Sequence, residues 1–144
     1  MVHTSHPAYG YRIEAGGCVV VWAPEFWEFP AWVAGADLMF AEAAAWGRPI
    51  RFPGGVGGHA TVQDVAAQAL RHGVRRLVYA HIGRPVLRAI DAGARPPAGE
   101  WGVEGRTYSV PLPVSRSTPA AGPGSRGRAV ARARPSPADG RAPG

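Results

Sequence analysis

The hydrophobic pattern of this 144-residue chain changes its period near Thr61, and this change limits the folds open to it. Before Thr61, apolar residues form short continuous runs at 18–22 and 38–41, which is typical of buried strands. After Thr61, apolar residues recur at the three- and four-residue spacing that predicts one buried stripe on a helix over 62–70. Strands that alternate with helices indicate an α/β fold made of packed layers.

Local signals place the other elements. The glycine pair at 16–17 lies between runs 11–15 and 18–22 and predicts a tight hairpin. Thr61 is the expected N-cap of the first helix, with Asp64 three residues later, and Gly73 is suited to its end. Residues 75–80 then read as a strand, Pro85 as the start of a second helix and Gly93 as its end. A last short strand is predicted over 107–110.

The composition divides the chain after residue 114. Residues 115–144 contain six Arg and one Asp among many Pro, Ala and Gly, whereas residues 1–114 contain ten Arg and nine acidic residues. Because residues 115–144 have few apolar side chains to bury, we expect them to form a disordered tail. Residues 1–114 are expected to form the folded domain. The Arg residues of the tail could bind nucleic acid weakly through counterion release.

The remaining composition narrows the class of protein. A single cysteine, Cys18, excludes an internal disulfide framework and reads as a small buried hydrophobe. No apolar run approaches the roughly 18 residues of a membrane span, and the N-terminus lacks the pattern of a signal peptide. We therefore expect a soluble, cytoplasmic protein without a membrane partner.

Four side chains near the ends of apolar runs could carry chemistry. His81 follows the strand at 75–80, which would place its imidazole where ligands of α/β folds gather. Asp37 stands before the run at 38–41, and Glu42 directly follows it. His59 lies just ahead of the first helix, after a glycine-rich segment that would let the backbone pass close to a site. The aromatic cluster Trp22, Phe26, Trp27, Phe29 and Trp32 could form core or wall a substrate pocket.

Three motifs in fixed order, Asp37-Leu-Met-Phe-Ala-Glu42, His59-Ala-Thr61 and Leu77-Val-Tyr-Ala-His81, resemble the metallo-β-lactamase superfamily. The likeness is to the C-terminal half of its phosphodiesterase and tRNase Z-like branches, and it covers roughly residues 2–110. The resemblance implies half of an αββα sandwich. It also implies a hydrolase that uses a metal-activated water, with a phosphoester as the more fitting substrate.

The resemblance also implies roles for individual residues. Asp37 would bridge two divalent ions, His81 would complete the ligands of the second ion, and His3 would supply another ligand, with His6 as its alternative. His59 would act as the general acid, and Glu42 would orient it. Zinc is the leading metal, with manganese or iron also compatible with mixed His and carboxylate ligands.

Two departures from the family pattern matter. The His-x-His-x-Asp-His cluster of the family does not occur in these 144 residues. We therefore expect the chain to be N-terminally truncated and incomplete alone, with an upstream segment or a second chain supplying the missing ligands. Ala60 stands where tRNase Z has Ser, which weakens a tRNA-specific assignment. An inactive fragment or interaction module, dimerising through an uncovered sheet face, is the alternative.

Overall fold

The computed structural model describes residues 7–110, which form a mixed five-stranded sheet with two α-helices. The sheet has the strand order β1-β2-β3-β6-β7, and a separate two-stranded hairpin joins β4 and β5. The strands are β1 (Tyr11–Ala15), β2 (Cys18–Ala23), β3 (Leu38–Ala43), β4 (Ile50–Arg51), β5 (Gly58–His59), β6 (Leu77–Ile82) and β7 (Glu100–Trp101). The α-helices are α1 (Val62–Arg71) and α2 (Arg84–Asp91), with 3-10 turns η1 (Ala31–Val33) and η2 (Pro53–Gly55).

The predicted hairpin is confirmed. Strands β1 and β2 pair antiparallel, and Gly16 and Gly17 between them have φ angles of 57° and 77°. Both angles lie in the left-handed region that only glycine enters without strain. Strands β2, β3, β6 and β7 then run parallel to one another, so their carboxyl ends meet at one edge of the sheet.

The expected ends of the first helix are also confirmed. The Thr61 hydroxyl accepts a hydrogen bond from the Asp64 backbone N–H at 3.0 Å, which satisfies one of the donors left free at a helix start. Gly73 follows the helix with φ 67°. The apolar stripe is buried as far as Ala69, but Leu70 at its end is 68% exposed.

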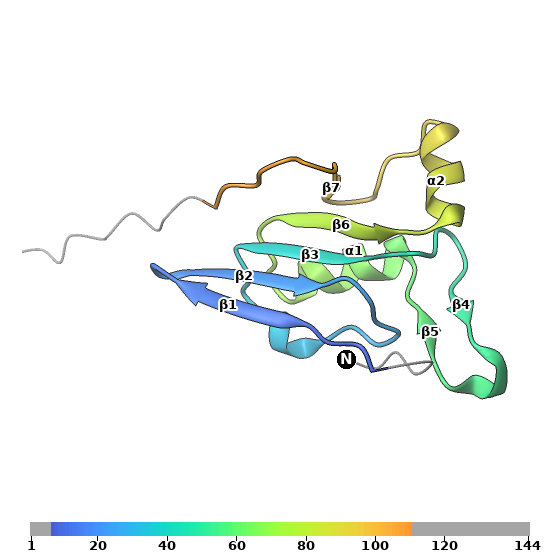
Figure 1. Cartoon of the computed structure of the whole chain (residues 1–144), viewed down its shortest axis with the longest axis horizontal. Helices are drawn as coiled ribbons and strands as arrows, with labels where there is room; N and C mark the ends of the chain where they lie inside the picture. The colour runs from blue at the N-terminus through green and yellow to red at the C-terminus, as the bar shows by residue number, and fades with distance from the viewer. Residues whose placement is uncertain (1–6, 111–144) are drawn as a thin grey trace, which may run out of the picture. The chain divides into compact units, whose positions relative to one another are not determined.

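Helix α1 lies across one face of the sheet, as Figure 1 shows, and the main core fills the space between them. That core includes Val21, Met39, Ala41 and Tyr79 from the strands and Val65 from the helix. The opposite face carries Tyr11, Ile13 and Trp22, which are 60%, 55% and 42% exposed. One face of the sheet is therefore covered by a helix, and the other presents apolar side chains to the surface.

Two strand predictions need correction. The strand expected at 75–80 begins two residues later, because Arg75 and Arg76 precede β6 and direct their side chains to Asp37 and Glu100. Residues 107–110 form no strand, and the Tyr108 hydroxyl instead accepts a hydrogen bond from the Val103 backbone N–H at 2.9 Å.

The α/β class predicted from the sequence is confirmed as a five-stranded mixed sheet with two helices. Among the helices of residues 7–110, none is long and apolar enough to cross a membrane. The predicted tail at 115–144 and both His3 and His6 lie outside the described residues.

Candidate functional site

The carboxyl edge of the parallel strands gathers three polar side chains. Glu25 follows β2, Glu42 lies near the end of β3 and His81 lies near the end of β6. His59, the last residue of β5, approaches the same point from the small hairpin. This edge is where α/β folds usually bind ligands.

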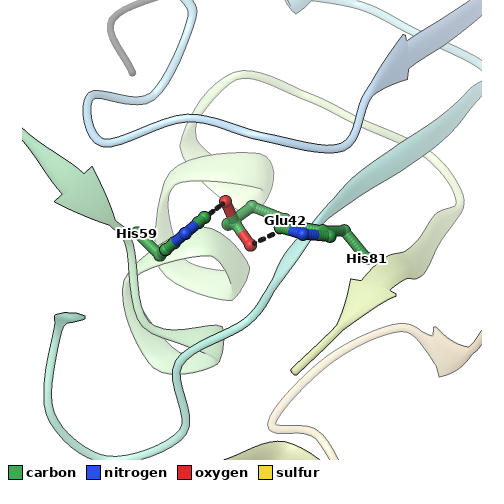
Figure 2. A group of neighbouring side chains, drawn as sticks. All are labelled: Glu42, His59 and His81. Atoms are coloured by element: carbon green, nitrogen blue, oxygen red, sulfur yellow. Dashed lines mark hydrogen bonds and ion pairs between the residues drawn. The ribbon is translucent and has the colours of Figure 1, made fainter. Parts of the chain in front are cut away.

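Glu42 is the centre of this group. Its side chain is fully buried, and Figure 2 shows its carboxylate between the two imidazole rings. Oε2 accepts hydrogen bonds from His59 Nδ1 at 2.8 Å and from the Phe26 backbone N–H at 3.1 Å. Oε1 accepts from the Ala44 backbone N–H at 2.7 Å and from His81 Nδ1 at 3.2 Å. These four donors use the full acceptor capacity of an ionised carboxylate.

The four hydrogen bonds determine the tautomers of the two histidines. An ionised carboxylate only accepts, so each imidazole donates its Nδ1–H to Glu42. In a neutral imidazole the other nitrogen, Nε2, is then the acceptor or metal ligand. His81 Nε2 lies 3.3 Å from Glu25 Oε1, and the two imidazole centroids are 5.2 Å apart.

An irregularity in the sheet turns His81 toward Glu42. Ala41 pairs with Tyr79 and Ala43 pairs with Ile82, so β6 contains one more residue than β3 over this interval. Such a bulge re-aims a side chain, and bulges are frequent beside active sites. Among the described residues, His81 is the one residue other than glycine with a positive φ, at 49°. Its backbone conformation is strained, a property that clusters at functional sites.

Glycines let the surrounding chain approach closely. A Cβ on Gly58 would lie 1.8 Å from the Ile50 carbonyl oxygen, and one on Gly83 would lie 2.4 Å from the Ala44 carbonyl oxygen. Gly58 precedes His59, and Gly83 lies two residues after His81. Both histidines therefore depend on a neighbouring glycine that allows close backbone packing.

The structure separates two residues that the family resemblance assigned to one metal site. Asp37 precedes β3, whereas His81 lies near the opposite, carboxyl end of the parallel β6. Five residues of strand separate Asp37 from Glu42, a distance of about 16 Å. The Asp37 carboxylate instead binds the Val19 backbone N–H at 2.8 Å and the Arg75 guanidinium at 2.7 Å. In this arrangement Asp37 joins β3 to its neighbours and does not share a site with His81.

The expected pair of Glu42 and His59 does come together, and it lies against His81. Glu25 is not among the residues that the sequence motifs predict for the site. The signal was present, because Glu25 stands two residues after the apolar run of β2, which ends at the same edge as β3 and β6. The predicted aromatic cluster is divided: Phe26 is fully buried and Phe29 packs on the core, whereas Trp22 and Trp32 are 42% and 40% exposed.

Residue types that bind divalent cations gather at this edge. Glu42, His59 and His81 each offer one ligand atom, and these atoms lie within 4.8 Å of one another. Two imidazoles with a carboxylate are common zinc ligands. Glu25 adds a second carboxylate beside His81.

The charges around His81 stabilise its protonated form. The hydrogen bond to Glu42 is the largest cause that raises the pKa of His81 above its ordinary value of 6.5. Partial burial lowers this pKa, while the charges of Glu42 and Glu25 and the Pro24 carbonyl raise it further. The stabilisation of the fold by protonated His81 is therefore complete below pH 6.5 and is lost as the pH rises through the raised pKa.

A titration followed by nuclear magnetic resonance checks this effect. In the metal-free chain, the ring protons of His81 are expected to titrate with a midpoint above pH 6.5. The Glu42→Gln substitution removes the charged acceptor, so the midpoint is expected to fall. The exposed Glu28→Gln substitution serves as the control and should leave the midpoint unchanged. A wild-type midpoint below 6.5 would contradict the described contacts.

Comparisons with known proteins found no match that could assign a function to the site. No protein-family model matches the sequence, and neither a curated protein nor a solved structure matches it.

Proposed function

We propose that this chain forms part of a metal-dependent hydrolase of the metallo-β-lactamase superfamily that cleaves phosphoesters. One observation carries the proposal: a fully buried carboxylate, Glu42, binds Nδ1 of both His59 and His81. A carboxylate that holds the Nδ1–H of an imidazole directs Nε2 outward and raises its basicity, as in many metal sites. Glu42 holds the Nδ1–H of two imidazoles at once.

We assign the cation ligands to His81 Nε2 and the Glu25 carboxylate. These atoms lie 3.3 Å apart. Ligands at about 2.1 Å from a tetrahedral zinc are separated by about 3.4 Å, so the observed spacing suits one shared ion. Glu42 is a positioning residue in this assignment, because its oxygens already accept four hydrogen bonds. Asp37 is not a ligand in this proposal, and Glu25 takes the place of the carboxylate that the resemblance assigned to it.

The remaining ligands come from outside residues 7–110, with His3 among the candidates that the resemblance implies. Two protein ligands are fewer than the three or four that zinc sites use. This proposal therefore retains the expectation of a complementing segment or partner chain.

The side chains divide the reaction between them. A bound divalent cation lowers the pKa of water and stabilises negative charge on a phosphoryl oxygen. His59 protonates the leaving oxygen of the ester as the general acid. Glu42, at 2.8 Å from His59 Nδ1, orients this imidazole. The low exposure of the His59 side chain, 13%, limits exchange of its proton with solvent.

Metal binding and phosphodiester hydrolysis test the proposal. Zinc binding is measured by calorimetry, and hydrolysis of bis(p-nitrophenyl) phosphate by absorbance. The His81→Gln substitution is expected to weaken zinc binding, and His59→Gln is expected to lower kcat about 100-fold or more with zinc binding retained. His72→Gln is the matched control, because His72 ends α1 and its Nδ1 binds the Gln68 carbonyl.

A chain that neither retains zinc nor hydrolyses the ester would exclude the hydrolase proposal for this polypeptide. The alternative is an inactive interaction module, and it is favoured by the exposed Tyr11, Ile13 and Trp22 on the open sheet face. It predicts self-association in sedimentation experiments. The proposed nucleic-acid contact of residues 115–144 stays a prediction, which truncation after Val114 would test in a salt-dependent binding assay.

A further inference from the structure

A pocket lined by aromatic side chains adjoins the site on the side of His81. Its volume is about 330 Å³. Its walls come from β2, β3 and β6 and from the segment that follows β7, and the lining includes Trp22, Phe40, His81, Val103 and Tyr108. Since His81 belongs both to this pocket and to the Glu42 cluster, a molecule bound here contacts the proposed catalytic site.

Within the group of Glu25, Glu42, His59 and His81, solvent reaches two side chains more than the others. The His81 and Glu25 side chains are 36% and 27% exposed, whereas those of His59 and Glu42 are 13% and 0% exposed. A substrate therefore reaches the two proposed ligand atoms through the exposed His81 and Glu25, and of these two residues His81 also lines the pocket.

The walls are arranged as separate ring surfaces. The Trp22 and Phe40 rings lie 5.5 Å apart at 47°, and the Phe40 and Tyr108 rings lie 5.3 Å apart at 89°. None of these pairs is stacked face to face, and Trp22 remains 42% exposed. Arg76 and Arg106 lie over the Tyr108 ring, so an additional planar ring packs against the exposed Trp22, and such a contact adds favourable energy beyond area burial.

The charges at the rim include a cation beside the aromatic walls. The Arg106 guanidinium lies 5.4 Å from the centre of the Tyr108 ring and 3.6 Å from the Glu100 carboxylate, and its side chain is 51% exposed. Glu104 also lines the pocket. Arg106 is held over Tyr108, where a guanidinium can contact an anionic group of a ligand that occupies the pocket.

We propose that this pocket binds the aromatic ring of an aromatic phosphoester, with Arg106 contacting the charged phosphoryl group. This inference rests on the proposed function, because it names the substrate class of the same site. The pocket is at the small end of the volumes found for ligand sites, roughly 300 to 1,000 Å³, and so suits one ring system rather than a polymer. Aromatic rings supply the apolar contact, and His81, which also lines the pocket, connects it to the proposed ligand atoms.

Binding of two matched phosphate esters tests the proposal. Binding is measured instead of hydrolysis rates, because the two esters also differ in the reactivity of their leaving groups. Phenyl phosphate and methyl phosphate are titrated into the full chain, with and without zinc, and binding is followed by the indole resonances. Phenyl phosphate is expected to bind about tenfold more tightly and to shift the Trp22 indole signal. Equal binding of the two esters would overturn the proposal.

Two tryptophans of similar exposure give a matched pair of variants. Trp22 and Trp32 are 42% and 40% exposed, but only Trp22 lines the pocket. Trp22→Leu is expected to weaken phenyl phosphate binding about fivefold or more and to leave methyl phosphate binding unchanged. Trp32→Leu should change neither. Tyr108→Phe keeps the ring and is expected to retain most of the preference for phenyl phosphate, even if Trp22→Leu fails to fold.

The outcomes separate this proposal from the proposed function. Selective binding of phenyl phosphate by a chain without hydrolytic activity would support the pocket and reject the hydrolase. Hydrolysis by a chain that binds both esters equally would support the hydrolase and reject the pocket. A dimer in sedimentation experiments that Trp22→Leu dissociates would also reject the pocket, because the same face would then be a contact between two copies.

Discussion

The Glu42→Gln variant is expected to lose about 3 kcal/mol of its free energy of unfolding. Glu42 is fully buried, and each carboxylate oxygen accepts one backbone N–H and one imidazole N–H. A glutamine amide replaces one oxygen with an NH2 group, which only donates. In either orientation it faces two donors, so a backbone N–H of Phe26 or Ala44 loses its partner inside the protein.

Urea denaturation of the two chains measures this loss. The exposed Glu28→Gln substitution makes the same chemical change and is expected to alter the free energy of unfolding by less than about 0.5 kcal/mol. If Glu42→Gln were as stable as Glu28→Gln, the hydrogen bonds that the replaced oxygen accepts would not contribute to folding. A second readout is zinc affinity, which is expected to fall about tenfold or more, because loss of such an orienting carboxylate typically has that effect.

The Gly58→Ala variant is expected to be destabilised by about 3 kcal/mol and to lose the placement of His59. Its Cβ would lie 1.8 Å from the Ile50 carbonyl oxygen and 2.8 Å from the Ile50 carbonyl carbon. Both are backbone atoms of the paired strand, so no side chain can rotate away. Strands β4 and β5 must separate, and β5 carries His59 toward Glu42.

Gly47→Ala is the matched control for this variant. Gly47 is exposed, and a Cβ added there meets no atom within 4 Å. We expect its free energy of unfolding to lie within about 0.5 kcal/mol of the wild-type value. A Gly58→Ala chain with wild-type stability and an unchanged His59 resonance would show that the β4 and β5 hairpin does not position this imidazole.

The elements that the sequence predicts well depend on neighbouring residues. The β1 and β2 hairpin follows from Gly16-Gly17, and the start of α1 follows from Thr61 and Asp64. Strand β7 was missed because Glu100 and Trp101 are too few to show a period. Its place in the sheet comes from parallel pairing with β6, which lies about twenty residues earlier in the chain.

In the site, too, contacts that depend on a sequence motif are predicted, whereas contacts that depend on strand pairing are not. The pairing of Glu42 with His59 was expected from the family resemblance and is present. The separation of Asp37 from His81 follows from strand direction. A residue before a parallel strand and a residue near the end of its neighbour lie toward opposite edges, but the sequence alone does not state that β3 and β6 are parallel neighbours. Glu25 joins His81 for the same reason, since it follows a third parallel strand.

The extra residue in β6 makes the site depend on the length of a strand as well as on its residue types. Between Tyr79 and Ile82 the strand takes three steps while β3 takes two, and His81 turns toward Glu42 within that interval. Loss of Ala80 would give the two strands the same number of steps over this interval and would remove the irregularity in which His81 is held. A chain lacking only Ala80 would keep Glu25, Glu42, His59 and the histidine itself in its sequence. It would lack the irregular segment of β6 in which His81 has its positive φ angle.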